Sequence, residues 1–372
     1  MKTRSSAWPL ALLFAGVVVY ASLYPFTGWR VQGVSPFAYL QAPLPQYWTG
    51  FDIASNLVGY APLGFLLSLA MLRSGWGNWS LWLAFGVPTL LSLTVETVQN
   101  YLPTRVPSNV DFVLNSAGAA LGAGCAWVMQ RLGGLRRWSQ FRADWVEPTA
   151  HGSLVLLALW PFALLYPLSI PFGLGQVWDR LEAGLVVLLE ETPFLTWVPV
   201  RLEAPDPLSP MAQAFCVALC LLSPLLMGFA EMRSIWRRVS FLVFFFVCAA
   251  GAAALSAALT YGPSHAWAWM SPQAGLGLII AVLAGLALVA LPRRLCTVVM
   301  LLCLAVSLTL LNQAPDSPYF AQSLEVWEQG RFIRFHGISQ WLGWLWPFAA
   351  LIFGLRAAAR LPVPTPTTKI EP

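Results

Sequence analysis

The sequence predicts an all-α protein, a polytopic transmembrane helix bundle. Of the 372 residues, 58% are hydrophobic and only 10% are charged. Soluble domains carry about 25% charged residues, so this chain has too few to cover a water-facing surface. The 22 Phe and 19 Trp residues indicate extensive burial, and six Cys are sparse for a chain of this length. Composition therefore excludes a disordered chain, a collagen-like chain and a disulfide-framed secreted domain.

Long apolar runs give the position of each helix. A helix needs about 20 residues to cross roughly 30 Å of hydrocarbon, and only helices or closed barrels satisfy their backbone there. The sequence predicts about ten spans, at residues 8–24, 52–72, 80–102, 109–129, 152–168, 209–230, 241–260, 273–291, 295–311 and 338–360. The first run has no clear small-residue cleavage site after it, so we expect a retained anchor and not a signal peptide.

Basic residues predict the orientation of these spans. Lys and Arg collect in short cytoplasmic loops, and 15 of the 21 basic residues fall on one side of the predicted spans. Both termini are therefore expected in the cytoplasm. The net charge of +5 is then explained by arginines at lipid headgroups, and no nucleic-acid partner is predicted.

The two longest outer loops are acidic and aromatic. Their acidic residues are Asp179, Glu182, Glu190, Glu191, Glu203, Asp206, Asp316, Glu325 and Glu328. Residues 177–191 place leucines between charges, which favours a helix lying at the interface or a shallow re-entrant segment. Tryptophans near the same boundary, at 267, 269, 327, 341 and 344, favour a belt at the headgroup level over a role in ligand stacking.

Cysteine and histidine do not indicate a metal site. The six cysteines lie within or at the start of predicted spans, so we expect small core residues without disulfides. The three histidines are scattered, and the sequence identifies no cofactor. Four regions are expected: a four-helix membrane domain at 1–130, a basic cytoplasmic connection at 131–151, a second membrane domain of about six helices at 152–360, and a Pro-rich cytoplasmic tail at 361–372.

The strongest functional signal is a pattern, D-x-x-x-N-x-x-G, that occurs twice, at residues 52–59 and 111–118. Residues four apart share one helix face. The pattern therefore puts Asp52 beside Asn56 near the start of the second helix, and Asp111 beside Asn115 near the start of the fourth.

The third helix completes this group of polar residues. It ends with Glu96 and Gln99 on one face, and Arg105 follows in the connection to the fourth helix. Because the third helix runs against the second and fourth, its end and their starts lie on the same side of the membrane. Small residues at 118–124 predict a close approach between helices.

These segments resemble the VanZ-like family, which is named for a teicoplanin-resistance membrane protein. The resemblance rests on DIASNLVGYAPLGF at 52–65, ETVQ at 96–99, Arg105, and DFVLNSAGAALG at 111–122. It covers the first four helices and implies a bacterial cytoplasmic (inner) membrane protein of the cell envelope, loosely associated with glycopeptide resistance. It implies no particular reaction, and the later helices lie outside it.

The candidate ligand-binding residues are Asp52, Asn56, Glu96, Gln99, Arg105, Asp111 and Asn115. Their three carboxylates and one arginine leave a formal excess of two negative charges, which a proton, a cation or a cationic ligand group would compensate. The alternative is structural: Arg105 clamps Glu96 and Asp111 while the amides hydrogen-bond across helices, with no ligand.

Three functions fit this group of residues. The first is binding of a polar or lipid-linked envelope ligand, such as a lipid-linked glycan, a peptidoglycan precursor or a glycopeptide, in an outward-facing polar cleft, with membrane lipid as a further partner. The second is a membrane-embedded enzyme in which Glu96 and Asp111 share acid and base roles on a lipid-linked substrate. The third is a proton-coupled transporter. Binding is favoured because the polar residues gather near one membrane face and no nucleophile or phosphate-loop motif is found.

Overall fold

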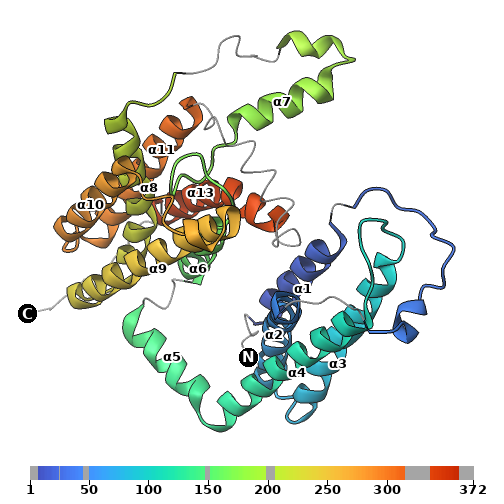
Figure 1. Cartoon of the computed structure of the whole chain (residues 1–372). Coiled ribbons are helices and arrows are strands. Elements are labelled where there is room, and N and C mark those ends of the chain that lie inside the picture. Colours follow the sequence, from blue (N-terminus) through green and yellow to red (C-terminus); the bar gives the residue numbers. More distant parts are fainter. Residues whose placement is uncertain are drawn as a thin grey trace, which may run out of the picture. The chain divides into compact units, whose positions relative to one another are not determined.

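The structure, a computed structural model, describes residues 7–24, 26–44, 50–146, 151–197, 206–314 and 336–359 (Figure 1). Throughout this part of the chain the regular secondary structure is helical, apart from an isolated bridge between Val146 and Met232. The prediction of an all-α fold is confirmed.

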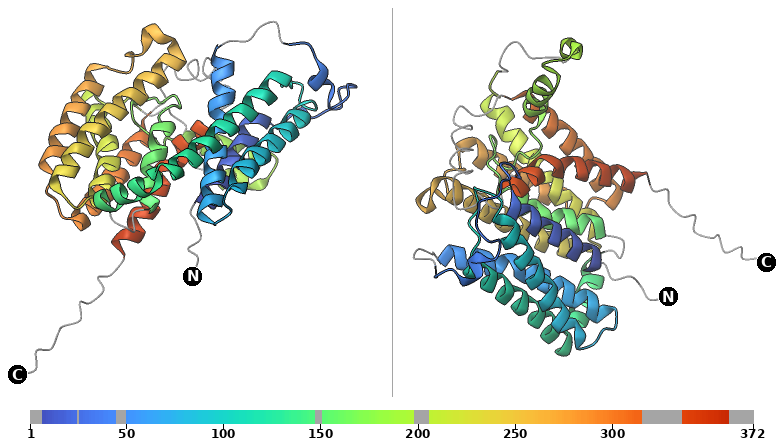
Figure 2. Two further views of the ribbon diagram at one scale, coloured as in Figure 1. Left: turned by 90° about the horizontal axis from the view of Figure 1, so that it is seen from below. Right: turned by 90° about the vertical axis from the view of Figure 1, so that its right-hand side faces the viewer.

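The chain divides into two compact units, Met1–Arg142 and Ala143–Pro372. In each unit the main helices run side by side in both views of Figure 2. The first unit contains α1 (Ala7–Leu23), η1 (Ala38–Gln41), α2 (Gly50–Arg73), α3 (Trp79–Gln99), α4 (Asn109–Arg131) and most of α5 (Gly134–Trp145). The second contains α6 (His151–Ala163), α7 (Trp178–Leu189), η2 (Pro193–Trp197), α8 (Pro210–Glu231), α9 (Ile235–Tyr261), η3 (Pro263–His265), α10 (Pro272–Ala287), α11 (Arg293–Gln313) and α13 (His336–Ala358).

Each of the ten predicted runs coincides with a helix, but the helices differ in length. Among the described residues, seven helices are long and apolar enough to cross a membrane, namely α2, α3, α4, α8, α9, α11 and α13. The helices α1, α6 and α10 are apolar but shorter, below the roughly 20 residues that a span needs. The count of ten spans and the cytoplasmic termini therefore stay predictions.

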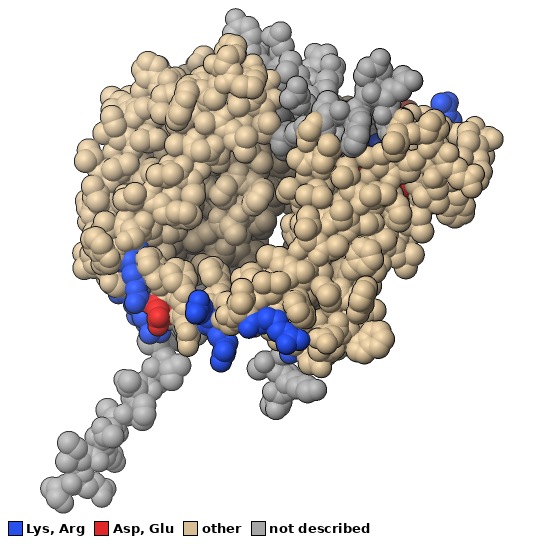
Figure 3. Space-filling view, turned by 60° about the horizontal axis from the view of Figure 1, so that its bottom comes forward, with Lys and Arg blue, Asp and Glu red and all other residues tan. Residues whose placement is uncertain are grey.

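Most of the surface in Figure 3 carries no charge, and Lys and Arg side chains gather in a few places on it.

The α6 helix ends earlier than predicted. The apolar run continues to residue 168, but the helix stops at Ala163 and a non-helical segment, residues 164–177, follows. Pro167 and Pro171 lack the backbone N–H that a continuing helix would use. Segment 164–177 is nevertheless buried at Leu164, Tyr166, Ile170, Phe172 and Leu174.

The amide of Asn312 in α11 holds the end of this segment, where α7 begins. Its Oδ1 accepts from the backbone N–H groups of Val177 and Trp178, at 2.9 and 3.0 Å. Its Nδ2 donates to the Gly175 carbonyl at 3.0 Å. A side chain from another helix therefore holds the end of segment 164–177.

In the first unit, α2 and α4 pack with their backbones close together. A Cβ atom added at Gly118 would lie 2.2 Å from the Leu57 carbonyl oxygen, and one at Gly122 would lie 1.9 Å from that of Ala61. Neither position can hold a larger residue without moving the helices apart. The predicted close approach at the small residues of α4 is confirmed.

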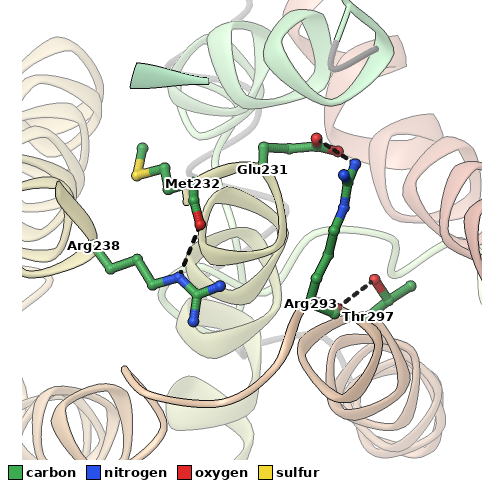
Figure 4. A network of polar contacts seen from close by, with 5 residues as sticks. All are labelled: Glu231, Met232, Arg238, Arg293 and Thr297. Carbon is green, nitrogen blue, oxygen red and sulfur yellow. Dashed lines mark hydrogen bonds and ion pairs between the residues drawn. The ribbon is translucent and has the colours of Figure 1, made fainter. Parts of the chain in front are cut away.

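In the second unit, α8 is the central helix, buried along most of its length, with α10 and α11 packed along it. A polar network lies at its C-terminal end (Figure 4). Arg293 and the buried Glu231 form an ion pair at 2.9 Å. The buried Arg238 donates to the carbonyls of Met232 at 3.2 Å, Val289 at 2.9 Å and Leu291 at 2.6 Å. Arg238 thereby satisfies carbonyl groups that the ends of α8 and α10 leave without helical partners.

The outer-loop predictions have different outcomes. The helix expected within residues 177–191 is present as α7, and its placement at a membrane interface stays a prediction. Trp267 is exposed, as a belt residue would be, whereas the indole nitrogen of Trp269 is buried. Five of the predicted outer-loop residues lie outside the described residues, namely Glu203, Asp316, Glu325, Trp327 and Glu328.

All six cysteines are free thiols. Cys125 is exposed, contrary to its expected place in the core.

Candidate functional site

Three neighbouring helices of the first unit each present two polar residues that are four positions apart. These six residues are Asn56 and Tyr60 in α2, Ser92 and Glu96 in α3, and Asp111 and Asn115 in α4, and together we call them the polar layer. Four-residue spacing places both members of a pair on the same helix face. The layer lies near the end of the unit where α2 and α4 begin and α3 ends. All six residues are buried except Asp111, which is partly exposed.

Hydrogen bonds within the polar layer join the three helices. Asn56 Nδ2 donates to Asp111 Oδ1 at 2.6 Å, which links α2 to α4. Asn115 Nδ2 donates to Ser92 Oγ at 3.0 Å, which links α4 to α3. Such bonds between helices are modest but real contributions to stability in a membrane.

The start of α4 is tied to Glu96. Ser108 is the N-cap, and its Oγ accepts from the backbone N–H groups of Val110 and Asp111, at 3.2 and 3.4 Å. The backbone N–H of Ser108 donates to Glu96 Oε2 at 3.0 Å. This capping satisfies donors that a helix start leaves open, and it fixes where Asp111 enters the layer.

Two polar atoms of the layer are buried and make no hydrogen bond within the described part of the chain: the Tyr60 hydroxyl and Asn115 Oδ1. The Tyr60 hydroxyl lies near Ser92 and Glu96 without meeting hydrogen-bond geometry. Buried side-chain polar atoms nearly always have a partner in native proteins. One donor–acceptor hydroxyl and one carbonyl acceptor of the layer therefore keep hydrogen-bonding capacity that no described residue uses.

Gln99 and Arg105 contact the end of α1. Gln99 Nε2 donates to the Ser22 carbonyl at 2.9 Å. The Arg105 guanidinium donates to the Tyr24 carbonyl at 2.7 and 3.1 Å and to the Ala21 carbonyl at 3.3 Å. Both side chains therefore anchor the end of α3 and the following loop to α1.

The structure thus brings together four of the seven predicted site residues, Asn56, Glu96, Asp111 and Asn115, through α2, α3 and α4. The Asp52 side chain lies outside the described residues. Ligand binding by any of the seven stays a prediction.

The segment that connects α1 to α2 folds back over α3 and α4. The Tyr39 hydroxyl of η1 lies 3.4 Å from both the Leu93 carbonyl and the Thr97 hydroxyl. Asn109 Nδ2 donates to the Ala42 carbonyl at 2.7 Å. Burial raises the pKa of Tyr39, so this hydroxyl stays neutral at physiological pH. Residues before α2 therefore cover part of the end of the unit that holds the polar layer.

Sequence reasoning missed Tyr39, Tyr60 and Ser92. Tyr60 and Ser92 had a usable signal, because each lies four residues from a predicted site residue, Asn56 and Glu96 respectively. Tyr39 had none, since it reaches α3 through a contact between distant parts of the chain.

The layer offers amide, hydroxyl and carboxylate groups, which suit hydrogen bonding to a polar ligand. Within the described residues, no group of three or more His, Cys, Asp or Glu is placed to hold a metal ion.

Comparison with known proteins identifies the first unit. Residues 6–130 match the family model described as VanZ/LLP1, and this match runs from the start of α1 almost to the end of α4. Searches of curated proteins and of solved structures each found no match. The N-terminal third of this multi-pass membrane protein is therefore a VanZ-like segment, and the polar layer lies within it.

Proposed function

We propose that this VanZ-like protein of the bacterial inner membrane binds the polar part of an envelope ligand at the polar layer. The ligand class is a lipid-linked glycan or a peptidoglycan precursor. The observation that carries the proposal is the pair of buried atoms without partners, the Tyr60 hydroxyl and Asn115 Oδ1, within a layer whose other groups are hydrogen-bonded.

The position of the layer supports a ligand with a lipid anchor. Asn56 lies within about two turns of the start of α2, and Asp111 lies in the first turn of α4. A polar group at this depth is near the headgroup region, while its acyl or isoprenoid chain stays in the bilayer. Hydroxyl groups of a glycan can donate to carboxylate and amide oxygens and accept from the Tyr60 hydroxyl.

The contacts of the carboxylates favour binding over the two alternatives. Asp111 and Glu96 each accept a hydrogen bond from a group of the protein, Asn56 and the Ser108 backbone respectively. These hydrogen bonds hold the two carboxylates in fixed positions. A transporter would need a polar path towards the bilayer midplane, whereas the polar layer gathers near one end of the unit. A link to teicoplanin resistance would follow if the protein bound the precursor that the antibiotic recognises.

The decisive variant is Tyr60→Phe, which removes only the hydroxyl. If the layer is purely structural, deleting a buried hydroxyl without a partner leaves the unfolding free energy unchanged or raises it. If the hydroxyl binds the ligand, retention of the ligand falls while stability holds. Native mass spectrometry of the purified full-length protein would measure retention of lipid or glycan. Tyr20→Phe, in α1, is the matched control.

Glu96→Gln and Asp111→Asn extend the test to the carboxylates. Both variants keep the shape of the side chain, so we expect inserted, folded protein with reduced ligand retention and altered susceptibility to envelope antibiotics. A loss of phenotype that only tracks lost thermal stability, or a wild-type protein that retains no specific lipid or glycan, would contradict the proposal.

A further inference from the structure

A cavity of about 260 Å³ lies in the second unit, apart from the VanZ-like segment. Its walls come from segment 164–177, the start of α8, the last turns of α9, and the residues that precede α10. All of these elements belong to one compact unit. The cavity is therefore independent of the polar layer and of the function proposed for it.

The backbone around this cavity is unusual for a membrane protein. Non-helical backbone at membrane depth is tolerated where it is buried in protein or lines a cavity. Segment 164–177 meets both conditions. Phe172 within it has a left-handed backbone conformation, with a φ of 65°. Non-glycine residues in this region are uncommon, and they gather at functional sites.

Aromatic packing holds Phe172 in this conformation. Its ring stacks on Trp160 with centroids 6.3 Å apart and meets Trp269 edge-on at 5.4 Å. Phe172 is almost fully buried. Together with the Asn312 hydrogen bonds at the end of the segment, this packing preforms one wall of the cavity.

The described residues that line the cavity are uncharged. None of them is Asp, Glu, Lys, Arg or His, and hydroxyl and amide side chains are present at Ser169, Gln213, Ser256, Thr260 and Ser271. Phe172, Tyr261 and Trp269 add aromatic surface. A charged ligand would lose its hydration here without gaining a counter-charge.

The polar groups around the cavity suit a ligand that both accepts and donates hydrogen bonds. Trp269 Nε1 is buried without a partner among the described residues, and a buried indole N–H usually finds an acceptor. Ser256 and Thr260 donate to the backbone carbonyls of Leu165 and Ser256, at 3.3 and 2.9 Å. Their hydroxyl oxygens therefore remain able to accept.

We propose that this cavity binds one uncharged sugar ring, either as a free sugar or as the headgroup of a glycolipid. A sugar ring has an apolar C–H face for the aromatic side chains and hydroxyl groups that both donate and accept. The volume of about 260 Å³ lies just below the range of ligand pockets, which is roughly 300 to 1,000 Å³, and this favours a single ring.

The test uses the full-length protein in phosphatidylcholine nanodiscs. One arm follows methyl glucoside and N-acetylglucosamine by saturation-transfer NMR, with glucosamine and glucuronate as their cationic and anionic counterparts. The other arm adds monoglucosyl diacylglycerol to the nanodiscs and measures its retention by native mass spectrometry. Binding in the first arm alone identifies a free sugar, and binding in the second alone identifies a glycolipid.

Two variants test the assignment of residues. Trp269→Phe keeps one aromatic ring but removes the N–H with the five-membered half of the indole, so affinity should fall by at least roughly three- to tenfold, as for one lost hydrogen bond. Ala257→Leu fills the cavity from α9 and should abolish binding. Trp267→Phe, at an exposed neighbouring indole, is the control and should bind like the wild type.

Three results would overturn the proposal. They are no saturable binding of a neutral sugar in either arm, equal binding of the charged counterparts, or the same affinity for Trp269→Phe and Trp267→Phe. Because the three variants change only residues of the second unit, their results leave the polar-layer proposal standing.

Discussion

The Asn56 side chain donates a 2.6 Å hydrogen bond to the Asp111 carboxylate and so joins the start of α2 to the start of α4. Two turns deeper, the same two helices meet at Gly118 and Gly122 with almost no side chain between them. The hydrogen bond and the glycine contacts therefore act on one helix pair. The hydrogen bond sets the register of α2 against α4 at the polar end, and the glycine contacts set the distance between the two helix axes.

We expect Asn56 and Asp111 to be energetically coupled. A hydrogen bond to a charged group contributes roughly 1.5 to 3 kcal/mol. Alanine substitutions at the two positions should therefore show a coupling energy of that size in a double-mutant cycle, measured by unfolding in detergent. The control cycle pairs Asn56 with Asn109, which hydrogen-bonds elsewhere, to Ala42, and should be additive. Additivity in the first cycle would show that the contact is not formed.

The glycine contact predicts opposite effects at two positions of α4. Gly122→Ala places a methyl group 1.9 Å from the Ala61 carbonyl oxygen, so the helices must separate at a cost of about 1 to 3 kcal/mol. Gly124→Ala meets nothing within 4 Å and should be neutral or stabilise by up to about 1 kcal/mol through helix propensity. Thermal melting in detergent checks both variants. Equal melting temperatures for the two would contradict the close approach of α2 and α4.

The Glu231–Arg293 ion pair should respond unequally to loss of either partner. The side chain of Glu231 is 6% exposed and that of Arg293 is 48% exposed. Arg293→Gln leaves a buried carboxylate without its ion partner, which costs roughly 1 to 3 kcal/mol, as for a buried group that loses its partner. Glu231→Gln should cost less, because the half-exposed Arg293 can turn towards water.

Unfolding in detergent measures this difference. Arg294→Gln, at the adjacent exposed residue, is the control for the loss of a basic charge at the start of α11. A larger effect from Glu231→Gln than from Arg293→Gln would refute the proposed asymmetry.

The predicted topology can be tested with single cysteines in a variant that lacks the six native ones, which are all free thiols. We expect this cysteine-free background to insert and fold. An impermeant thiol reagent applied to intact cells should label Ser35→Cys and Ser264→Cys on the outer side, and it should leave Asn78→Cys and Ser234→Cys unlabelled. The reverse labelling pattern would invert the orientation.

The sequence alone determined where the apolar helices lie. All ten apolar runs coincide with helices because hydropathy and helix formation depend on residues that are close in the chain. The repeated pattern at 52–59 and 111–118 also predicted correctly that Asn56 and Asp111 would lie at the same end of the unit. This prediction worked because consecutive antiparallel helices have their ends at alternating sides.

Tertiary structure alone decided which polar groups contact one another. Arg105 donates to carbonyl groups at the end of α1, and Tyr39 reaches α3 from a connecting segment; spacing along the chain does not encode either contact. Asn312 in α11 holds the end of the non-helical segment that follows α6, through hydrogen bonds to Gly175, Val177 and Trp178. Trp269 lines a cavity between distant segments of the second unit, and its place in a headgroup belt stays a prediction. Several donors and acceptors lie at the same depth in a helical bundle, and packing between distant helices determines which of them meet.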